Sequence, residues 1–154
     1  MGPNPTDRAK SGTKRSLMTE GAGVPIGLAV SGANTHDKWL VEPTLKSLAI
    51  ERPAPTVRQP QYLCMDKGYD YVDIRELVAE WGYTAKIKAR GEEQAERKNV
   101  PGYRARRWVV ERTHSWLNRF RRLLIRWEKK SDNYTAFLHF ACAWITFRAA
   151  EVVG

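Results

Sequence analysis

The sequence YLCMDKGY, residues 62–69, is the most informative segment of the chain because it combines a dense apolar run with an acid and a turn. Its first four residues are typical of a strand buried on both faces of a sheet. Lys67-Gly68-Tyr69 then predicts a turn directly after Asp66. Functional groups of α/β proteins collect at the carboxyl ends of strands, but an Asp there also caps turns. Position alone favours neither role for Asp66.

The segments around this strand alternate between helix and strand patterns. Residues 13–19 and 25–30 predict a β-hairpin around the turn 20–23. Residues 36–48 predict a helix capped by Thr35 or Asp37, in which Pro43 marks a kink or a later first turn. Downstream, residues 71–81 predict an amphipathic helix closed by Gly82, and residues 83–89 alternate as a half-buried strand.

The last third of the chain predicts a loop at 91–103, a helix at 104–127 and a final helix at about 134–152, capped by Ser131 or Asp132. The final helix is apolar nearly all round, which predicts burial. The element order indicates an α/β fold with one mixed sheet. Residues 1–12 are rich in small and polar types, so we expect a disordered segment followed by one domain over 13–154.

Positive charge is concentrated in one segment. The chain carries 26 Lys or Arg against 17 Asp or Glu, a net charge of +9, which favours a nucleic acid over the competing acidic membrane surface. Residues 104–130 alone hold ten basic and two acidic residues, or +8. A solvated helix face would interleave acids with bases, so a phosphate-binding surface is favoured.

Other features of the sequence narrow the class of protein. No apolar run approaches the roughly 20 residues that span a bilayer, and residues 1–16 lack the apolar part of a secretory signal. We therefore expect a soluble cytoplasmic protein. Cys64 and Cys142 lie in apolar runs without zinc-ligand spacing, so we predict buried, reduced thiols.

Glu111 stands among arginines when residues 104–127 are projected on one helix. One narrow stripe then carries it with Arg104, Arg107, Ser115, Asn118 and Arg122, while the other faces carry the predicted core contacts Val109, Trp116, Phe120, Leu123 and Trp127. Such a carboxylate is either a surface ion pair or a metal ligand whose arginine neighbours hold phosphates. Asp66 supplies a second acid. Two divalent ions held by carboxylates can activate a water or 3′-hydroxyl and stabilise the leaving oxygen, although a third acid is usually wanted.

The strings CMDKGYD (64–70) and RRWVVERTHSWLNRFRRL (106–123), with GLAVSGANTHD (27–37) and EPTLKSL (42–48), resemble the catalytic core of DDE-type insertion-sequence transposases over residues 13–150. The resemblance implies an RNase H-like mixed sheet flanked by helices, and two-metal DNA cleavage and strand transfer with Mg²⁺ or Mn²⁺. It assigns Asp66 and Glu111 as the second and third catalytic acids and metal ligands, with Arg107 four residues before Glu111. Tyr103 stands one residue away from the tyrosine position of the family.

The resemblance also indicates which residues bind DNA. The basic residue that the family places about seven positions after the glutamate falls on Asn118, and we assign that role to Arg122. The predicted DNA-binding residues are Arg104, Arg107, Asn118, Arg119, Arg122 and Lys67. The expected partner is DNA at the ends of a transposable element, bound by a homo-oligomer that is cytoplasmic and associated with the nucleoid.

The first acid of the family lies on a strand ahead of the hairpin, and this sequence departs from that pattern. Before residue 20 the only aspartate is Asp7, which has no apolar strand around it. The resemblance therefore implies a domain that is incomplete at its N-terminus and inactive alone, from a truncated gene or the downstream frame of a two-frame gene. An upstream-frame segment would then be a partner.

The histidines are not predicted to be catalytic. For His36 and Asp37, a helix start is favoured over a catalytic pair. His114 and His139 show no ligand spacing.

Two other functions stay open on sequence grounds. A non-catalytic basic protein that binds DNA or RNA would explain the charge but not an acid inside an arginine stripe. A metal-dependent nuclease of the same fold would use the same acids outside transposition. Terminal inverted repeats around the gene and an overlapping upstream frame would favour transposition.

Overall fold

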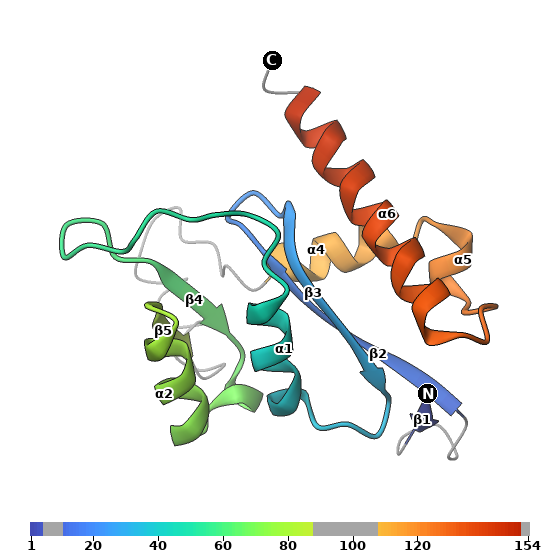
Figure 1. Ribbon diagram of the computed structural model, residues 1–154, viewed down its shortest axis with the longest axis horizontal. Helices are drawn as coiled ribbons and strands as arrows, with labels where there is room; N and C mark the ends of the chain where they lie inside the picture. Colours follow the sequence, from blue (N-terminus) through green and yellow to red (C-terminus); the bar gives the residue numbers. More distant parts are fainter. Residues whose placement is uncertain (5–10, 88–107, 152–154) are drawn as a thin grey trace, which may run out of the picture.

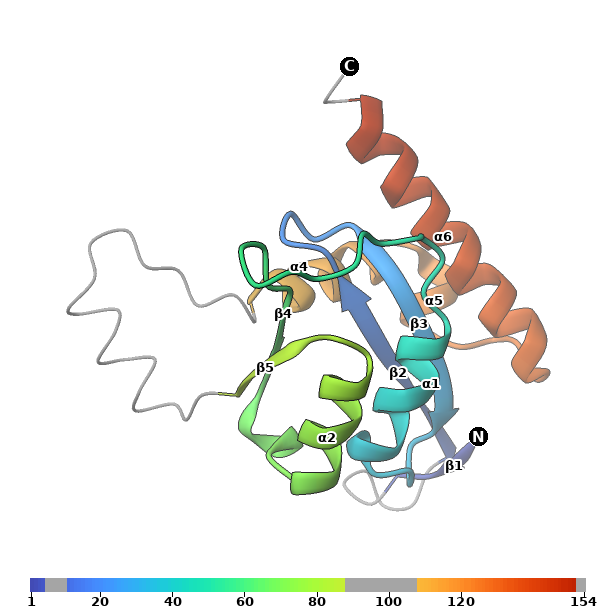
Figure 2. The same cartoon turned by 60° about the vertical axis from the view of Figure 1, so that its left-hand side comes forward.

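The computed structural model describes residues 1–4, 11–87 and 108–151, and it is a mixed α/β structure (Figure 1). Strands form a three-stranded antiparallel sheet, β1-β2-β3, and a separate parallel pair, β4-β5. Helices lie on both sides of the strands (Figure 2). The expectation of one mixed sheet is therefore wrong for the described residues, because β2 and β4 are not paired with each other.

The hairpin is formed as predicted, with longer strands. β2 (Ser11–Thr19) pairs antiparallel with β3 (Pro25–Gly32), and the carboxylate of Glu20 accepts hydrogen bonds from two backbone N–H groups of the turn. β1 (Gly2–Pro3) pairs with the start of β2. Gly2, Pro3, Ser11 and Gly12 are therefore ordered, although disorder was predicted over residues 1–12. Residues 5–10 lie outside the described residues.

A short 3-10 helix, η1 (Asp37–Leu40), leads into α1 (Val41–Lys46). Pro43 stands in the first turn of α1, where a proline is tolerated, so the later start is confirmed. The predicted caps are wrong: His36 Nδ1 accepts the Lys38 N–H at 3.3 Å instead. Thr35 and Asp37 are used elsewhere, since Thr35 bonds the Ser31 hydroxyl and Asp37 pairs with Lys14.

The element order around residue 66 is the predicted one. β4 (Tyr62–Met65) leads through η2 (Lys67–Tyr69) and α2 (Val72–Glu80) to β5 (Thr84–Ile87), which is parallel to β4. Gly82 ends the crossover helix with φ +75°, a conformation that favours glycine. β4 itself is half-buried rather than buried on both faces, because no described strand covers its second edge.

The predicted helix over 104–127 is broken. α4 (Trp108–Leu117) ends before Asn118, and α5 (Arg121–Leu124) begins after Phe120, whose backbone is extended. This break turns Phe120 and Leu123 into a core with α6 (Ser131–Glu151). The predicted loop at 91–103, the end of the strand predicted over 83–89 and the start of the helix predicted from 104 lie outside the described residues.

Two hydrophobic cores flank the hairpin. One joins α1 and α2 to the strands around Met18, Leu45 and Val78, and the other joins α4, α5 and α6 to β3 around Leu28 and Leu138. Neighbouring residues of β2 point to opposite sides, since Met18 belongs to the first core and Leu17 packs against the second.

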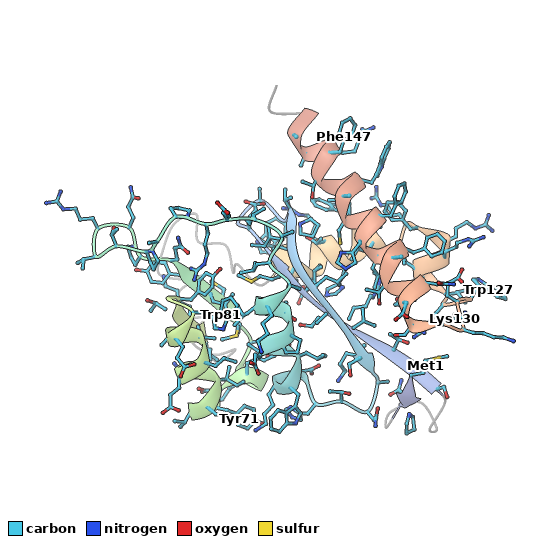
Figure 3. All side chains as sticks on the ribbon, in the orientation of Figure 1. Met1, Tyr71, Trp81, Trp127, Lys130 and Phe147 are labelled. Carbon is cyan, nitrogen blue, oxygen red and sulfur yellow. The ribbon has the colours of Figure 1, made fainter. Side chains whose placement is uncertain are left out.

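The prediction that the final helix is buried all round is wrong. Phe140 and Phe147 are 68% and 55% exposed, and the second half of α6 extends beyond the rest of the molecule (Figures 1 and 3). Trp127, expected in the core, is 74% exposed because the helix that would have turned it inward is broken.

Candidate active-site cleft

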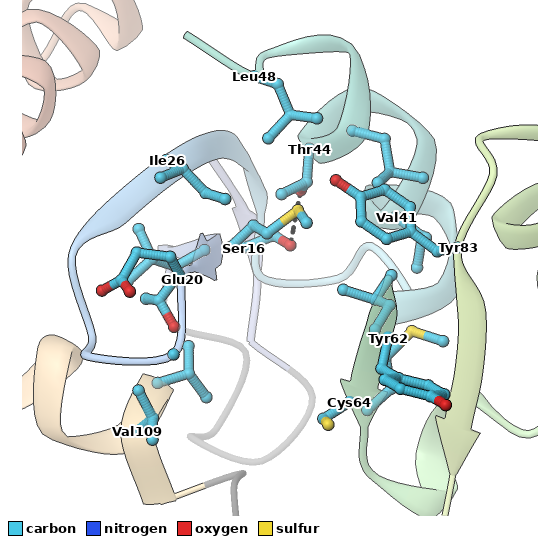
Figure 4. A pocket seen from close by; sticks show the side chains of 18 of the residues that line it. Ser16, Glu20, Ile26, Val41, Thr44, Leu48, Tyr62, Cys64, Tyr83 and Val109 are labelled. Atoms are coloured by element: carbon cyan, nitrogen blue, oxygen red, sulfur yellow. Dashed lines mark hydrogen bonds between the residues drawn. The ribbon is translucent and has the colours of Figure 1, made fainter. Parts of the chain in front are cut away.

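An open cleft of about 1310 Å³ separates β2 from β4 (Figure 4). Residues of these two strands form two of its walls. α1 lines it on one side, through Val41, Thr44 and Leu45, and the first turns of α4 line it through Trp108, Val109 and Glu111. The cleft therefore lies in the strand layer, between the two layers of helices.

Asp66 lies at the carboxyl end of β4 and lines this cleft. One of its carboxylate oxygens accepts the Gly68 N–H at 2.8 Å, so it caps η2 as turn chemistry predicts. The side chain is exposed, and a carboxylate with one hydrogen bond keeps lone pairs for a cation. The two roles considered for Asp66 are therefore compatible.

Tyr69 is a cleft residue that the sequence did not single out. Burial, and after it the negative charges of Asp37 and Asp66, raise the pKa of its phenol to about 12. The phenol is therefore neutral at physiological pH, near both acids. The pairing of Asp37 with Lys14 and the cap at His36 agree with a helix start rather than a catalytic pair.

Glu111 lies in the first turn of α4 and lines the same cleft as Asp66, although the two are 45 positions apart in the chain. It is exposed, while Val109 and Thr113 on the same helix are buried. His114, one turn further, also lines the cleft. Burial and then the charge of Arg15 lower the pKa of His114, so its imidazole is neutral at pH 7.

The donor set suits a hard cation only in part. Mg²⁺ binds through one or two carboxylates and keeps several waters, and the oxygens of Asp66 and Glu111 are of this type. Across residues 1–4, 11–87 and 108–151, no group of three His, Cys, Asp or Glu is close enough to hold a metal ion. A third acid, Glu20, also lines the cleft, but its carboxylate accepts hydrogen bonds from the N–H groups of Ala22 and Val24. The cleft thus offers two acids, Asp66 and Glu111, that are not used by the hairpin turn.

The arginine stripe predicted beside Glu111 does not continue past Leu117, because the helix ends there. Asn118 instead accepts a hydrogen bond from Arg15 at 2.8 Å. Arg122 pairs with Glu128 at 3.0 Å and lies over the ring of Phe137. Its predicted place on the face of Glu111 is therefore wrong.

Several arginines of the +8 segment stabilise the fold. Arg112 lies between the rings of Trp108 and Trp116 and bonds the carbonyl of Ala22. Arg126 bonds the Thr13 hydroxyl and lies over a tyrosine ring. Arg119 and Lys67 are exposed, whereas Arg104 and Arg107 lie outside the described residues.

Arg15 is a second cleft residue that the sequence did not single out. Its Nη1 is buried, and the residues that the structure describes give it no hydrogen-bond partner. The sequence does not reveal this burial, because the alternating pattern of the strand does not show which side chains the rest of the molecule covers.

The cysteines are free, as predicted, but they are half-buried rather than buried. Burial raises the pKa of Cys142 to about 11.

The structure and the cleft define a mixed α/β protein with two acids at a strand end and a helix, a class that includes metal-dependent phosphoryl-transfer enzymes. Residues 2–146 match the transposase DDE domain family, so the chain belongs to this family. It is 36% identical, over 155 aligned residues, to the transposase assigned to insertion sequence element IS402 of Burkholderia cepacia. That alignment covers 97% of this chain and 71% of the relative.

No solved structure matches this chain significantly. No helix of the described residues is long and apolar enough to span a membrane.

Proposed function

We propose that this chain carries the second and third acids, Asp66 and Glu111, of a transposase catalytic centre that cleaves and joins DNA at the ends of an insertion sequence. The fold of the complete centre is RNase H-like in this proposal. The observation that carries it is that both acids line one cleft from different elements, in a member of the DDE transposase family.

The chemistry of the cleft suits phosphodiester transfer. Asp66 and Glu111 would hold Mg²⁺ or Mn²⁺, which supplies activation of the attacking oxygen and stabilisation of the leaving oxygen. Asp66 is held by the turn that it caps, and Glu111 by the buried side of α4. The neutral phenol of Tyr69 adds no further negative charge beside a phosphate.

The isolated chain does not cut DNA in this proposal. Two-metal transfer needs carboxylates that bridge both ions, and two acids are too few. The missing acid belongs to polypeptide of the same transposase that is absent from the 154 residues. The active complex would be a homo-oligomer on DNA, in the cytoplasm and at the nucleoid.

In this proposal, basic residues of the chain bind the DNA phosphates. We propose contacts from Arg104, Arg107, Asn118, Arg119, Arg122 and Lys67. Among the described residues of this set, Arg119 and Lys67 are exposed and the most available to a phosphate. Asn118 already contacts Arg15, and Arg122 already pairs with Glu128. Such contacts hold the DNA backbone and carry little sequence preference.

The test uses a longer product, in which the chain follows a transposase segment that supplies the first acid. The substrate is DNA carrying the terminal inverted repeats of the element. Asp66→Asn and Glu111→Gln should each abolish Mg²⁺-dependent cleavage and leave DNA binding unchanged. Asp132→Asn, at the exposed start of α6, is the matched control and should cut normally.

Three results would contradict the proposal. Cleavage that survives Asp66→Asn or Glu111→Gln would remove these acids from the catalytic centre. Mg²⁺-dependent cleavage by the purified 154-residue chain would show that it holds a full ligand set, and Asp37 would be the next residue to test. DNA binding without any cleavage by the longer product would favour a non-catalytic DNA-binding protein.

A further inference from the structure

The outer face of α6 carries large apolar side chains that the described part of the chain leaves uncovered. Leu138 and Ala141 turn the opposite face of the helix toward the second core. On the outer face, Phe140, Trp144 and Phe147 are 68%, 49% and 55% exposed, and the rings of Trp144 and Phe147 lie 6.0 Å apart. Phe147 lies on the half of the helix that extends beyond the rest of the molecule (Figure 3). Neighbouring exposed aromatic residues of this kind mark an interaction surface.

Two rows of residues on this face repeat every seven positions, as in a helix that pairs with another helix. At 100° per residue, positions 133, 140 and 147 fall within about 40° of one another, and positions 136, 143 and 150 form a second row beside them. These rows have the spacing of the a and d positions of a coiled coil. The six residues, here called the α6 seam, are all exposed and uncharged: Asn133, Phe140 and Phe147 in the first row, and Ala136, Ala143 and Ala150 in the second.

The α6 seam alternates larger and smaller residues, and this pattern is complementary to itself in one register. Two antiparallel copies of α6 can be aligned so that Phe140 of each copy lies opposite Ala143 of the other. In the same alignment, Phe147 lies opposite Ala136, and the outermost positions also match. Every layer then combines a larger and a smaller side chain, which keeps the two helices at a constant separation. The pattern therefore favours a second copy of this chain as the occupant of the face.

A parallel pair would not have this property. It would place Phe140 on Phe140 and Ala143 on Ala143, so that wide and narrow layers alternate along the pair. The distance between packed helices depends on the side chains at the contact, and one distance cannot suit both kinds of layer. The antiparallel arrangement also leaves room for the rest of each molecule, because Leu138 and Ile145, which face the second core, lie about 140–160° around the helix from Phe140.

The exposed area sets the strength of such a pair. An aromatic side chain has about 150–250 Å² to bury, so the exposed parts of the three rings supply about 350 Å² in each copy and about 700 Å² in a pair. The exposed alanines bring the total close to the roughly 1,000 Å² of a weak but specific interface. We therefore expect a dissociation constant on the order of 10 μM, so that the dilute chain is monomeric.

We propose that α6 is a pairing helix, through which two copies of this chain associate antiparallel with Phe140 of each copy against Ala143 of the other. The inference deepens the homo-oligomer of the proposed function and rests on that function for the need of two copies, whereas the contact rests on the exposed face of α6. Two copies held on one DNA molecule would meet at a much higher effective concentration than free chains, so a weak contact suffices there.

Sedimentation velocity of the purified chain between about 1 and 300 μM tests the pairing. A reversible dimer should form as the concentration rises. Added salt should leave it unchanged or strengthen it, because screening reduces the repulsion between two chains of net charge +9.

Variants of one layer test the register. Ala143→Phe places Phe opposite Phe, and Phe140→Ala places Ala opposite Ala, so each should raise the dissociation constant about tenfold or more. The double variant exchanges the larger and the smaller residue within the same layers, and it should restore the dissociation constant to within about threefold. Thr146→Ala, at an exposed position beside the α6 seam, is the control and should pair as the parent chain does. Thermal unfolding of the dilute chains should differ little, which separates loss of pairing from loss of folding.

Several results would overturn the proposal. A chain that stays monomeric over the whole range would do so, and so would a double variant that pairs no better than the single ones. Association that salt abolishes would show that charged groups or bound DNA join the copies instead. Loss of pairing in the longer transposase product would show that the added polypeptide covers the α6 seam. Cleavage assays keep the two proposals apart, because a longer product that pairs but does not cut rejects only the catalytic one.

Discussion

The hydroxyl of Thr113 on α4 donates a hydrogen bond to the carbonyl of Gly23 in the hairpin turn, at a distance of 2.6 Å. Thr113 is completely buried, and its hydroxyl also lies 3.1 Å from the Val109 carbonyl. Gly23 has φ +94°, so the turn presents its carbonyl in a conformation that favours glycine. This contact fixes the first turns of α4, and with them Glu111, against the hairpin.

Replacing Thr113 with valine should cost about 1–3 kcal/mol, because the Gly23 carbonyl would stay buried without its donor. Urea unfolding at constant m-value measures this loss, and Thr113→Ser should recover part of it. Thr135→Val is the matched control, because the Thr135 hydroxyl bonds only the exposed first turn of α6. Equal losses for the two valine variants would show that the contact with Gly23 contributes nothing.

Arg119→Ala and Lys67→Ala should each flatten the salt dependence of DNA binding. Each phosphate contact adds about 0.9 to the slope of log affinity against log salt concentration. Fluorescence anisotropy with labelled duplex DNA at several salt concentrations gives this slope. Arg75→Ala is the control, because it removes the same charge from α2, where Arg75 pairs with Asp70. A similar change for Arg75→Ala would mean that the charge acts without specific contacts.

His114 should make the protein less stable in mild acid. Its pKa in the folded protein is lowered by burial and by Arg15, from an ordinary value of 6.5. The unfolded chain binds this proton near pH 6.5 and the folded chain does not, so the free energy of unfolding falls as the pH drops below that value and is unaffected above it. His114→Gln should weaken this fall. His139→Gln, at an exposed position of α6, should leave the profile unchanged.

Leu138→Ala should cost about 2–5 kcal/mol, because Leu138 is fully buried in the second core. Phe140→Ala, two residues away on the exposed side of α6, removes a larger side chain that is already in contact with water. Its cost should stay within about 0.5 kcal/mol. Thermal unfolding of the two variants makes the comparison. A large loss for Phe140→Ala would show that this face is covered in solution.

The local patterns of the sequence predicted the hairpin, β4, α2 and β5. Each is defined by residues close together in the chain, such as the 3.6-residue spacing from Ile74 to Trp81 and the glycine at position 82. The break after Leu117 was not predictable in this way, because Asn118, Arg119 and Phe120 are ordinary helix residues. It depends on the packing of Phe120 and Leu123 against α6, which is a long-range contact.

The candidate site was predictable only in its acids. Asp66 and Glu111 stand in recognisable contexts, at a strand end and in a helix. That both line one cleft depends on how β2, β4 and α4 are arranged, which no single segment determines. Three further features could not be predicted, because they also depend on how distant segments are arranged. They are the gap between β2 and β4, the buried guanidinium of Arg15 and the contacts of Arg122.

Leu17 and Met18 are neighbours in β2, yet they pack in different hydrophobic cores. A slip of the hairpin by one residue would exchange the two side chains and spoil both cores at once. The irregular pairing at Met18 and Thr19 resists such a slip. Both hydrophobic cores therefore depend on the same hairpin, and neither can unfold without disturbing the other. Heating should unfold both cores in a single calorimetric transition.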